Sequence, residues 1–164
     1  MASPNCDDRP TATAVDLIVI HNISLPPGEF GSGYIQQLFT NTLDCTSHSY
    51  FESLVELRVS SHLLIERDAA LTQFVPFNKR AWHAGESCYK GRNACNDFSI
   101  GIELEGTDDE EFTPQQYHQL QQVLMCLFAT YPTLNERAIV GHSDIAPGRK
   151  TDPGPKFDWQ QIKF

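Results

Sequence analysis

The chain has 164 residues, the size of one domain with a single hydrophobic core. Hydrophobic residues make up 40% and charged residues 20%, a globular composition that excludes disordered and collagen-like proteins. The formal net charge of −9 argues against a nucleic-acid partner, because proteins that bind along phosphates carry a basic face. No apolar run approaches the roughly 20 residues that cross a bilayer, so we expect no membrane association.

The N-terminal segment, residues 1–14, is polar and contains proline, and we expect it to be poorly structured. It lacks the basic start and apolar stretch of a secretory signal, which favours a cytoplasmic location. The five cysteines are odd in number and show no CxxC spacing, so neither a zinc knuckle nor a full disulfide framework is expected. Cys126 sits in an apolar helical pattern and is expected in the core.

The first predicted element is a strand over residues 15–20, a short β-branched run typical of a central strand covered on both faces. His21 follows it directly. Prolines and a glycine then break the chain into a long loop, residues 24–49, in which 34–39 is predicted to form a short helix. Proline, glycine and polar residues in this loop indicate that it can move over a cleft.

Three more strands are predicted along the middle of the chain, over residues 58–66, 71–75 and 98–105, the first two joined by a turn. The segment 98–105 alternates between apolar side chains on one face and small or acidic side chains on the other. Glu103 and Glu105 share the second face, where a carboxylate can point into a cleft.

The clearest helix is predicted to begin after Thr113, whose hydroxyl can cap it. Pro114 occupies the first helical position and Gln116 completes a capping box. Apolar residues recur at helical spacing up to Tyr131, and Pro132 ends the helix. A last short strand over residues 138–141 leads into a second histidine.

Strands interrupted by helices predict an α/β fold, a mixed β-sheet flanked by α-helices, in a single domain over residues 1–164. His21 and His142 each follow a short apolar strand, so both can lie at one edge of the sheet. Asp152 follows His142 across a loop rich in proline and glycine. Two imidazoles and a carboxylate with an open fourth position form a recognised catalytic zinc ligand set. Spacing alone also allows structural histidines and an ordinary Asp-Pro-Gly turn.

Four separated segments resemble the type-2 N-acetylmuramoyl-L-alanine amidases. They are HNISLPPG (21–28), RAWHAG (80–85), NDFSIGIELEG (96–106) and HSDIAPGRKTDPG (142–154). The resemblance covers nearly the whole chain in the same order, and four motifs in register make it specific. It implies a mixed sheet flanked by helices, in agreement with the pattern of predicted elements.

The resemblance assigns His21, His142 and Asp152 to a Zn²⁺ ion at the edge of the sheet. It also implies that Glu103 is the proton acceptor and that Lys150 stabilises the transition state. From the residues alone, Glu103 could equally be a solvent-facing strand residue and Lys150 a surface lysine. Glu105, on the same face as Glu103, is the rival base.

The activity implied by the resemblance is hydrolysis of the amide bond between the lactyl group of (1,6-anhydro-)N-acetylmuramic acid and L-alanine in muropeptides. This reaction belongs to peptidoglycan recycling in the cytoplasm. The expected partner is the small muropeptide, and no obligate protein partner is expected. Candidate substrate contacts are Asn22, Arg58, Trp82 and Arg149, because arginines recognise carboxylates and an indole can stack on sugar or peptide.

Other histidines compete for the metal or the substrate. His83 lies in a polar, glycine-ended segment and is a candidate to touch substrate, whereas His62 lies inside a predicted strand and is interpreted as structural. His48 and His118 belong to no ligand pattern and are expected at the surface.

Three other functions remain open at this point. The first is an amidase acting on intact, crosslinked peptidoglycan outside the cytoplasm, which the missing signal peptide disfavours. The second is a peptidoglycan-recognition module that binds without cutting, which the complete His21, His142 and Asp152 set disfavours. The third, a redox or metal-storage protein, has no supporting cysteine spacing.

Overall fold

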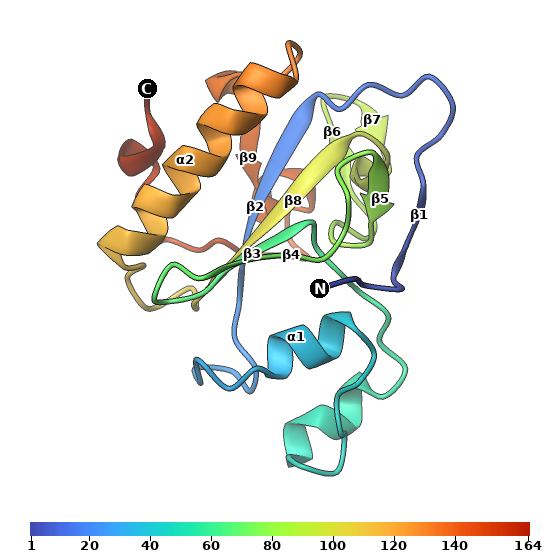
Figure 1. Cartoon of the computed structure of the whole chain (residues 1–164), viewed down its shortest axis with the longest axis vertical. Coiled ribbons are helices and arrows are strands. Elements are labelled where there is room, and N and C mark those ends of the chain that lie inside the picture. The colour runs from blue at the N-terminus through green and yellow to red at the C-terminus, as the bar shows by residue number, and fades with distance from the viewer.

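A five-stranded mixed sheet with strand order β4-β3-β8-β2-β9 forms the centre of the molecule (Figure 1). The computed structural model describes all 164 residues. The strands of this sheet are β2 (Leu17–Ile23), β3 (Leu63–Ile65), β4 (Leu71–Gln73), β8 (Ser99–Glu105) and β9 (Ile139–Gly141). Only β4 runs antiparallel to its neighbour. The predicted mixed sheet flanked by helices is confirmed.

The remaining elements lie around this sheet. They are β1 (Cys6–Asp8), β5 (Lys79–Ala81), β6 (Cys88–Tyr89), β7 (Arg92–Asn93), α1 (Tyr34–Phe39), α2 (Pro114–Thr130), α3 (His142–Ile145), and four 3-10 turns, η1 (Ser49–Leu54), η2 (Cys95–Asp97), η3 (Glu136–Ala138) and η4 (Trp159–Ile162). No helix among them is both long and apolar enough to span a bilayer.

One face of the sheet is covered by α2, which lies along the strands in Figure 1. The predicted capping box is confirmed. The backbone amide of Gln116 donates to the Thr113 hydroxyl at 3.1 Å, and the backbone amide of Thr113 donates to the side-chain oxygen of Gln116 at 3.0 Å. Gln116 is also buried and donates to the carbonyls of Ile65 and Glu105, at 3.2 and 2.9 Å. The start of α2 is therefore fixed to two strands of the sheet.

A second group of apolar side chains lies beyond the end of β2, where the chain leaves the sheet and turns into α1. Figure 1 places α1 and η1 together at the end of the molecule away from α2. Phe39 and Phe74 meet edge to face in this cluster, with ring centroids 5.2 Å apart. The predicted loop 24–49 thus holds a packed helix that anchors one side of the site.

The N-terminal segment, residues 1–14, was expected to be poorly structured, but part of it forms a strand that pairs with β5. β1 pairs with β5 in an antiparallel ladder, and Arg80 forms ion pairs with Asp7 and Asp97. The guanidinium of Arg9 donates to four backbone carbonyls, those of Phe77, Asn96, Asp97 and Ser99. Because these acceptors belong to the backbone, no pattern of side chains in the sequence indicates them.

Several predicted boundaries are also corrected. The predicted strand 58–66 is shorter in the structure, where β3 spans only Leu63–Ile65. The Ser60 amide donates to the Trp82 carbonyl and does not pair with a strand of the sheet. The predicted strand 71–75 ends at Gln73. Cys126 is exposed rather than in the core, since it lies on the outer side of α2.

Candidate metal centre and active site

Three potential ligand atoms converge near the C-terminal ends of the parallel strands β2 and β9. The Nδ1 atoms of His21 and His142 lie 2.9 Å apart, and Asp152 Oδ2 lies 2.9 Å from the first and 3.1 Å from the second. Both histidines are buried, and the side chain of Asp152 is 13% exposed. The group is therefore compact enough to hold one metal ion.

The protonation of His142 is consistent with a cation in this group. Its Nε2 lies 3.0 Å from the carbonyl oxygen of Ala84, which can only accept, so Nε2 carries the proton. An imidazole that carries its single proton on Nε2 directs the lone pair of Nδ1 at the carboxylate of Asp152. Two acceptor atoms facing each other at 3.1 Å are stabilised by a positive ion between them. The residues present therefore fit a divalent metal.

The sheet brings these residues together from distant parts of the chain. β2 and β9 are parallel neighbours, with Ile20 opposite Gly141, so His21, within β2, lies beside His142, which directly follows β9. The loop that carries Asp152 folds back onto His142's neighbour, because the Ser143 amide donates to the Asp152 carbonyl at 3.0 Å. This local hydrogen bond places the carboxylate beside the two imidazoles.

Glu103 lies on β8 directly opposite His21. Its carboxylate is buried, and Oε2 has no hydrogen-bond partner. Burial raises the pKa of Glu103 well above its ordinary value; Asp152 raises it further, and Lys150 opposes both. A carboxyl group with a raised pKa at a cavity is suited to accept a proton.

A cavity of about 280 Å³ joins these groups. Its lining includes His21, His142, Asp152, Glu103 and Lys150. The structure thus gathers the three predicted metal ligands and both predicted catalytic residues around one space.

Glu105, the rival to Glu103, has a different environment. Its two carboxylate oxygens accept from the backbone amides of Gly31, at 2.6 Å, and Arg67, at 3.1 Å. Its side chain does not line the cavity. Glu105 therefore holds two loops in place, whereas Glu103 lines the cavity.

The buried histidines His62 and His83 occupy distinct places. His62 accepts from the Gly101 amide at 3.0 Å and donates to the Lys79 carbonyl at 3.1 Å, and burial lowers its pKa to about 3. Burial likewise lowers the pKa of His21 to about 4, and that of His83 well below its ordinary value. His62 links strands, whereas His83 lines the cavity and contacts His21.

The predicted substrate contacts separate into two pairs. Asn22 and Trp82 line the cavity. Arg58 and Arg149 do not; Arg58 is exposed and donates to two backbone carbonyls of its own turn. Asn22 also donates to Asp108 Oδ1 at 2.7 Å and to the Pro153 carbonyl at 3.1 Å, so it braces the turn after Asp152.

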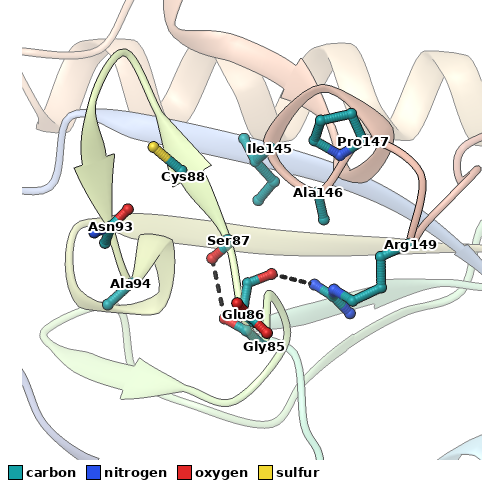
Figure 2. A pocket seen from close by; sticks show the side chains of 10 residues that line it. All are labelled: Gly85, Glu86, Ser87, Cys88, Asn93, Ala94, Ile145, Ala146, Pro147 and Arg149. Carbon is teal, nitrogen blue, oxygen red and sulfur yellow. Dashed lines mark hydrogen bonds between the residues drawn. The ribbon is translucent and has the colours of Figure 1, made fainter.

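Arg149 lies on a separate, more open hollow of about 650 Å³ between the β6–β7 hairpin and the end of α3 (Figure 2). Figure 2 shows its guanidinium turned toward Glu86, whose carbonyl it contacts at 2.6 Å. The same nitrogen, Nη2, also donates to the Ala84 carbonyl at 2.6 Å. Arg149 therefore holds the backbone segment that binds His142.

One wall of the cavity was missed by sequence reasoning. It consists of residues from α1 and from the segment that follows it, Leu38, Phe39, Tyr50, Leu54, Leu57 and Val59. Tyr50 and Leu57 are exposed despite their apolar surface. Hydrophobic periodicity does not identify the residues after α1, because Tyr50 and Leu54 lie in the short 3-10 turn η1 and Leu57 and Val59 lie in irregular backbone.

Comparison with known proteins agrees with this geometry. The family model described as N-acetylmuramoyl-L-alanine amidase matches residues 11–155. The chain belongs to this amidase family. A 1,6-anhydro-N-acetylmuramyl-L-alanine amidase, AmpD, from Salmonella typhimurium is 55% identical over 98% of this chain and 86% of its own length. The Escherichia coli K12 protein of the same name is also 55% identical, over 98% of this chain and 87% of its own.

Solved structures of amidases share this fold. The crystal structure of a selenomethionine AmpD derivative superposes with a TM-score of 0.96 at 55% identity, covering 99% of this chain and 90% of that one. The amidase AmiD from E. coli, in complex with anhydro-N-acetylmuramic acid-L-Ala-D-gamma-Glu-L-Lys, has a TM-score of 0.66 at 31% identity, covering 94% of this chain and 59% of that one.

Proposed function

We propose that this chain is a zinc-dependent amidase that hydrolyses the bond between the lactyl group of 1,6-anhydro-N-acetylmuramic acid and L-alanine in muropeptides. The observation that carries the proposal is the single cavity lined by His21, His142, Asp152, Glu103 and Lys150. Family membership and the names of the AmpD relatives support the substrate class.

His21, His142 and Asp152 are the proposed zinc ligands. When bound, zinc supplies Lewis-acid chemistry, which polarises a carbonyl and lowers the pKa of water. Three protein ligands leave a fourth position for water or substrate, as in other catalytic zinc sites. The ligand atoms lie on the cavity rather than in a closed core, which is consistent with a catalytic and not a purely structural metal.

Glu103 is the proposed general base. Its Oε2 has no protein partner, so this oxygen is free to accept a proton from the attacking water. Its raised pKa makes the carboxylate a stronger base than an exposed glutamate. The same carboxyl group can then donate that proton to the nitrogen of the departing L-alanine.

Lys150 is the proposed stabiliser of the developing oxyanion. It lines the same cavity, and its charge lies near enough to Glu103 to oppose the rise of that residue's pKa. A fixed positive charge beside an oxygen that becomes negative lowers the barrier, because the stabilisation grows as the charge develops.

We also propose Asn22, Arg58, Trp82 and Arg149 as substrate contacts. Trp82 and Asn22 are supported by their place on the cavity. The arginines lie outside it, where they could reach only the outer parts of a bound peptide. Alanine substitution of each contact should raise KM; unchanged KM removes that residue from the set.

A cytoplasmic role in wall recycling completes the proposal, with the muropeptide as the only partner required. All five cysteines are free thiols in the structure. Free thiols persist in a reducing compartment. The fragment released by wall turnover is a small molecule that a cavity of this size can accept at its reacting end.

The deciding experiment is mass spectrometry of anhydromuropeptide incubated with zinc-loaded and chelator-treated protein. We expect the zinc-loaded protein alone to produce the anhydro-sugar and the free peptide. Cleavage at another bond, or cleavage that survives chelation, contradicts the proposal. A parallel incubation with purified sacculi tests the alternative substrate, and faster release from sacculi would favour an enzyme for intact peptidoglycan.

A further inference from the structure

The ring of His83 contacts the ring of His21 on the side away from the proposed metal. His83 Nδ1 lies 2.9 Å from His21 Nε2, and the two rings meet edge to face with centroids 5.0 Å apart. The nitrogen of His21 that faces His142 and Asp152 is the other one, Nδ1. Whatever proton lies between His83 and His21 therefore decides whether His21 Nδ1 is free to bind a metal.

The direction of the His83–His21 hydrogen bond follows from the backbone carbonyl of Cys95, which His83 reaches through the Ser99 hydroxyl. The carbonyl oxygen of Cys95 can only accept, so the Ser99 hydroxyl donates to it at 2.6 Å and uses its single proton. The Ser99 oxygen must then accept from His83 Nε2, which lies at 3.1 Å. A neutral His83 consequently carries its proton on Nε2 and presents Nδ1 as an acceptor.

His21 completes the chain of donors. Because His83 Nδ1 accepts, His21 Nε2 must donate, and the neutral ring of His21 keeps the lone pair on Nδ1. We propose that Ser99 and His83 are positioning residues that hold His21 in the tautomer able to bind zinc. Hydrogen bonds of this kind to the second ring nitrogen orient metal-binding histidines in general.

The surroundings of His83 hold its ring in this place. Asn96 Oδ1 accepts from the backbone amides of His83, at 3.1 Å, and Ala84, at 2.8 Å. The ring also lies against Gly101 of β8, where an added Cβ would come within 2.5 Å of the His83 ring. A glycine is therefore required beneath the ring.

His83 and its neighbour Ala84 each form a hydrogen bond to one of the two proposed histidine ligands. His83 orients His21 through its side chain, and Ala84 orients His142 through its carbonyl, at 3.0 Å from Nε2. The short segment 83–84 thus sets the tautomers of two ligands that are far apart in the sequence. This placement assigns the RAWHAG motif a role in metal binding without making His83 a ligand.

The substitution Ser99→Ala tests the relay at a residue that does not touch the ligands. Without the Ser99 acceptor, His83 can carry its proton on Nδ1 and donate to His21 Nε2, which transfers the His21 proton to Nδ1. We expect the zinc Kd to rise by about 10- to 100-fold, measured by competition with a chromogenic chelator. His83→Leu should weaken zinc binding similarly, and His83→Gln should restore part of it because its side-chain oxygen can accept from His21.

Ser87→Ala is the matched control. Ser87 is also buried, donates to the Gly85 carbonyl at 3.0 Å and accepts from the Cys95 amide at 3.1 Å. It serves the same region without a histidine partner among its hydrogen bonds. Its zinc Kd should remain that of the unmodified protein; an equal loss in Ser87→Ala and Ser99→Ala would show a general structural effect and overturn the relay.

This inference rests on the proposed zinc site, so a readout without metal is needed as well. Two-bond nitrogen–proton NMR correlations of the chelator-treated protein report the tautomers of His21 and His83 directly. We expect both rings protonated at Nε2, and a shift toward Nδ1 in Ser99→Ala; unchanged tautomers overturn the relay. Failure of the unmodified protein to bind zinc would instead overturn the proposed metal site, and the tautomers would still decide the relay.

Discussion

Glu103 lies opposite His21 in the parallel ladder between β8 and β2. Adjacent parallel strands place these two side chains near one edge of the sheet, so a proposed base and a proposed ligand are held by the same backbone hydrogen bonds. The site is therefore built on two paired central strands, of which β8 is fully buried and β2 is buried through His21. Rigid placement keeps the reacting groups at fixed separations.

Glu103→Gln should stabilise the metal-free protein at neutral pH. The pKa of Glu103 is raised in the folded protein. Below the unfolded value of about 4.5, Glu103 is protonated in both the folded and the unfolded protein, so the variant has no stability advantage there. As the pH rises toward and through the folded pKa, the unmodified protein loses stability. We expect the variant to be more stable than the unmodified protein at high pH, measured by urea denaturation across pH. A gain that persists at low pH would contradict the assigned cause.

Glu103→Gln and Glu105→Gln should differ in turnover as well as in stability, and the more stable variant should be the inactive one. Glu103→Gln is expected to keep zinc and lose turnover, since the amide cannot accept the proton. Glu105→Gln should retain turnover but lower the free energy of unfolding by about 1–3 kcal/mol, because it weakens hydrogen bonds from two backbone amides. Zinc content, turnover and denaturation measured on both variants check this; full turnover in Glu103→Gln would remove it as the base.

Lys150→Ala should lower kcat by about 10²- to 10³-fold, the usual effect of removing one oxyanion-stabilising group. KM and zinc content should change little, because Lys150 is not a proposed ligand and acts mainly when charge develops. Steady-state kinetics with anhydromuropeptide provide the measurement. A rise in KM with unchanged kcat would instead place Lys150 in substrate binding.

Arg9→Ala should destabilise the protein even though Arg9 lies in the N-terminal segment and outside the cavity. The change removes donors to four backbone carbonyls, which connect this segment to the turn before β5, to η2 and to the start of β8. We expect a loss of about 1–3 kcal/mol in the free energy of unfolding, measured by thermal or urea denaturation. Unchanged stability would mean that the segment contributes little despite its contacts.

The strongest local patterns in the sequence predicted the central elements well. The β-branched run before His21 and the alternation around Glu103 correspond to β2 and β8, and the Thr113–Gln116 capping box starts α2. Each of these signals depends on neighbouring residues only, which is why it can be read without knowledge of the fold.

The remaining features depend on contacts between distant segments. The adjacency of β2 and β9, which brings His21 to His142, arises from parallel pairing that leaves no local mark in the sequence. The order of the N-terminal segment depends on Arg9 donating to backbone carbonyls, and any residue type supplies those acceptors. The contact of Ser99 with His83 likewise becomes visible only once the chain is folded.

The position of β9 at the outer side of β2 also affects how the chain can fold. Until residues 139–141 have been synthesised, the apolar strand β2 has a partner only on its β8 side, and its other edge is open. Open edges of apolar strands pair readily with other chains. The last strand therefore protects the nascent protein from aggregation in the same step that delivers His142 beside His21.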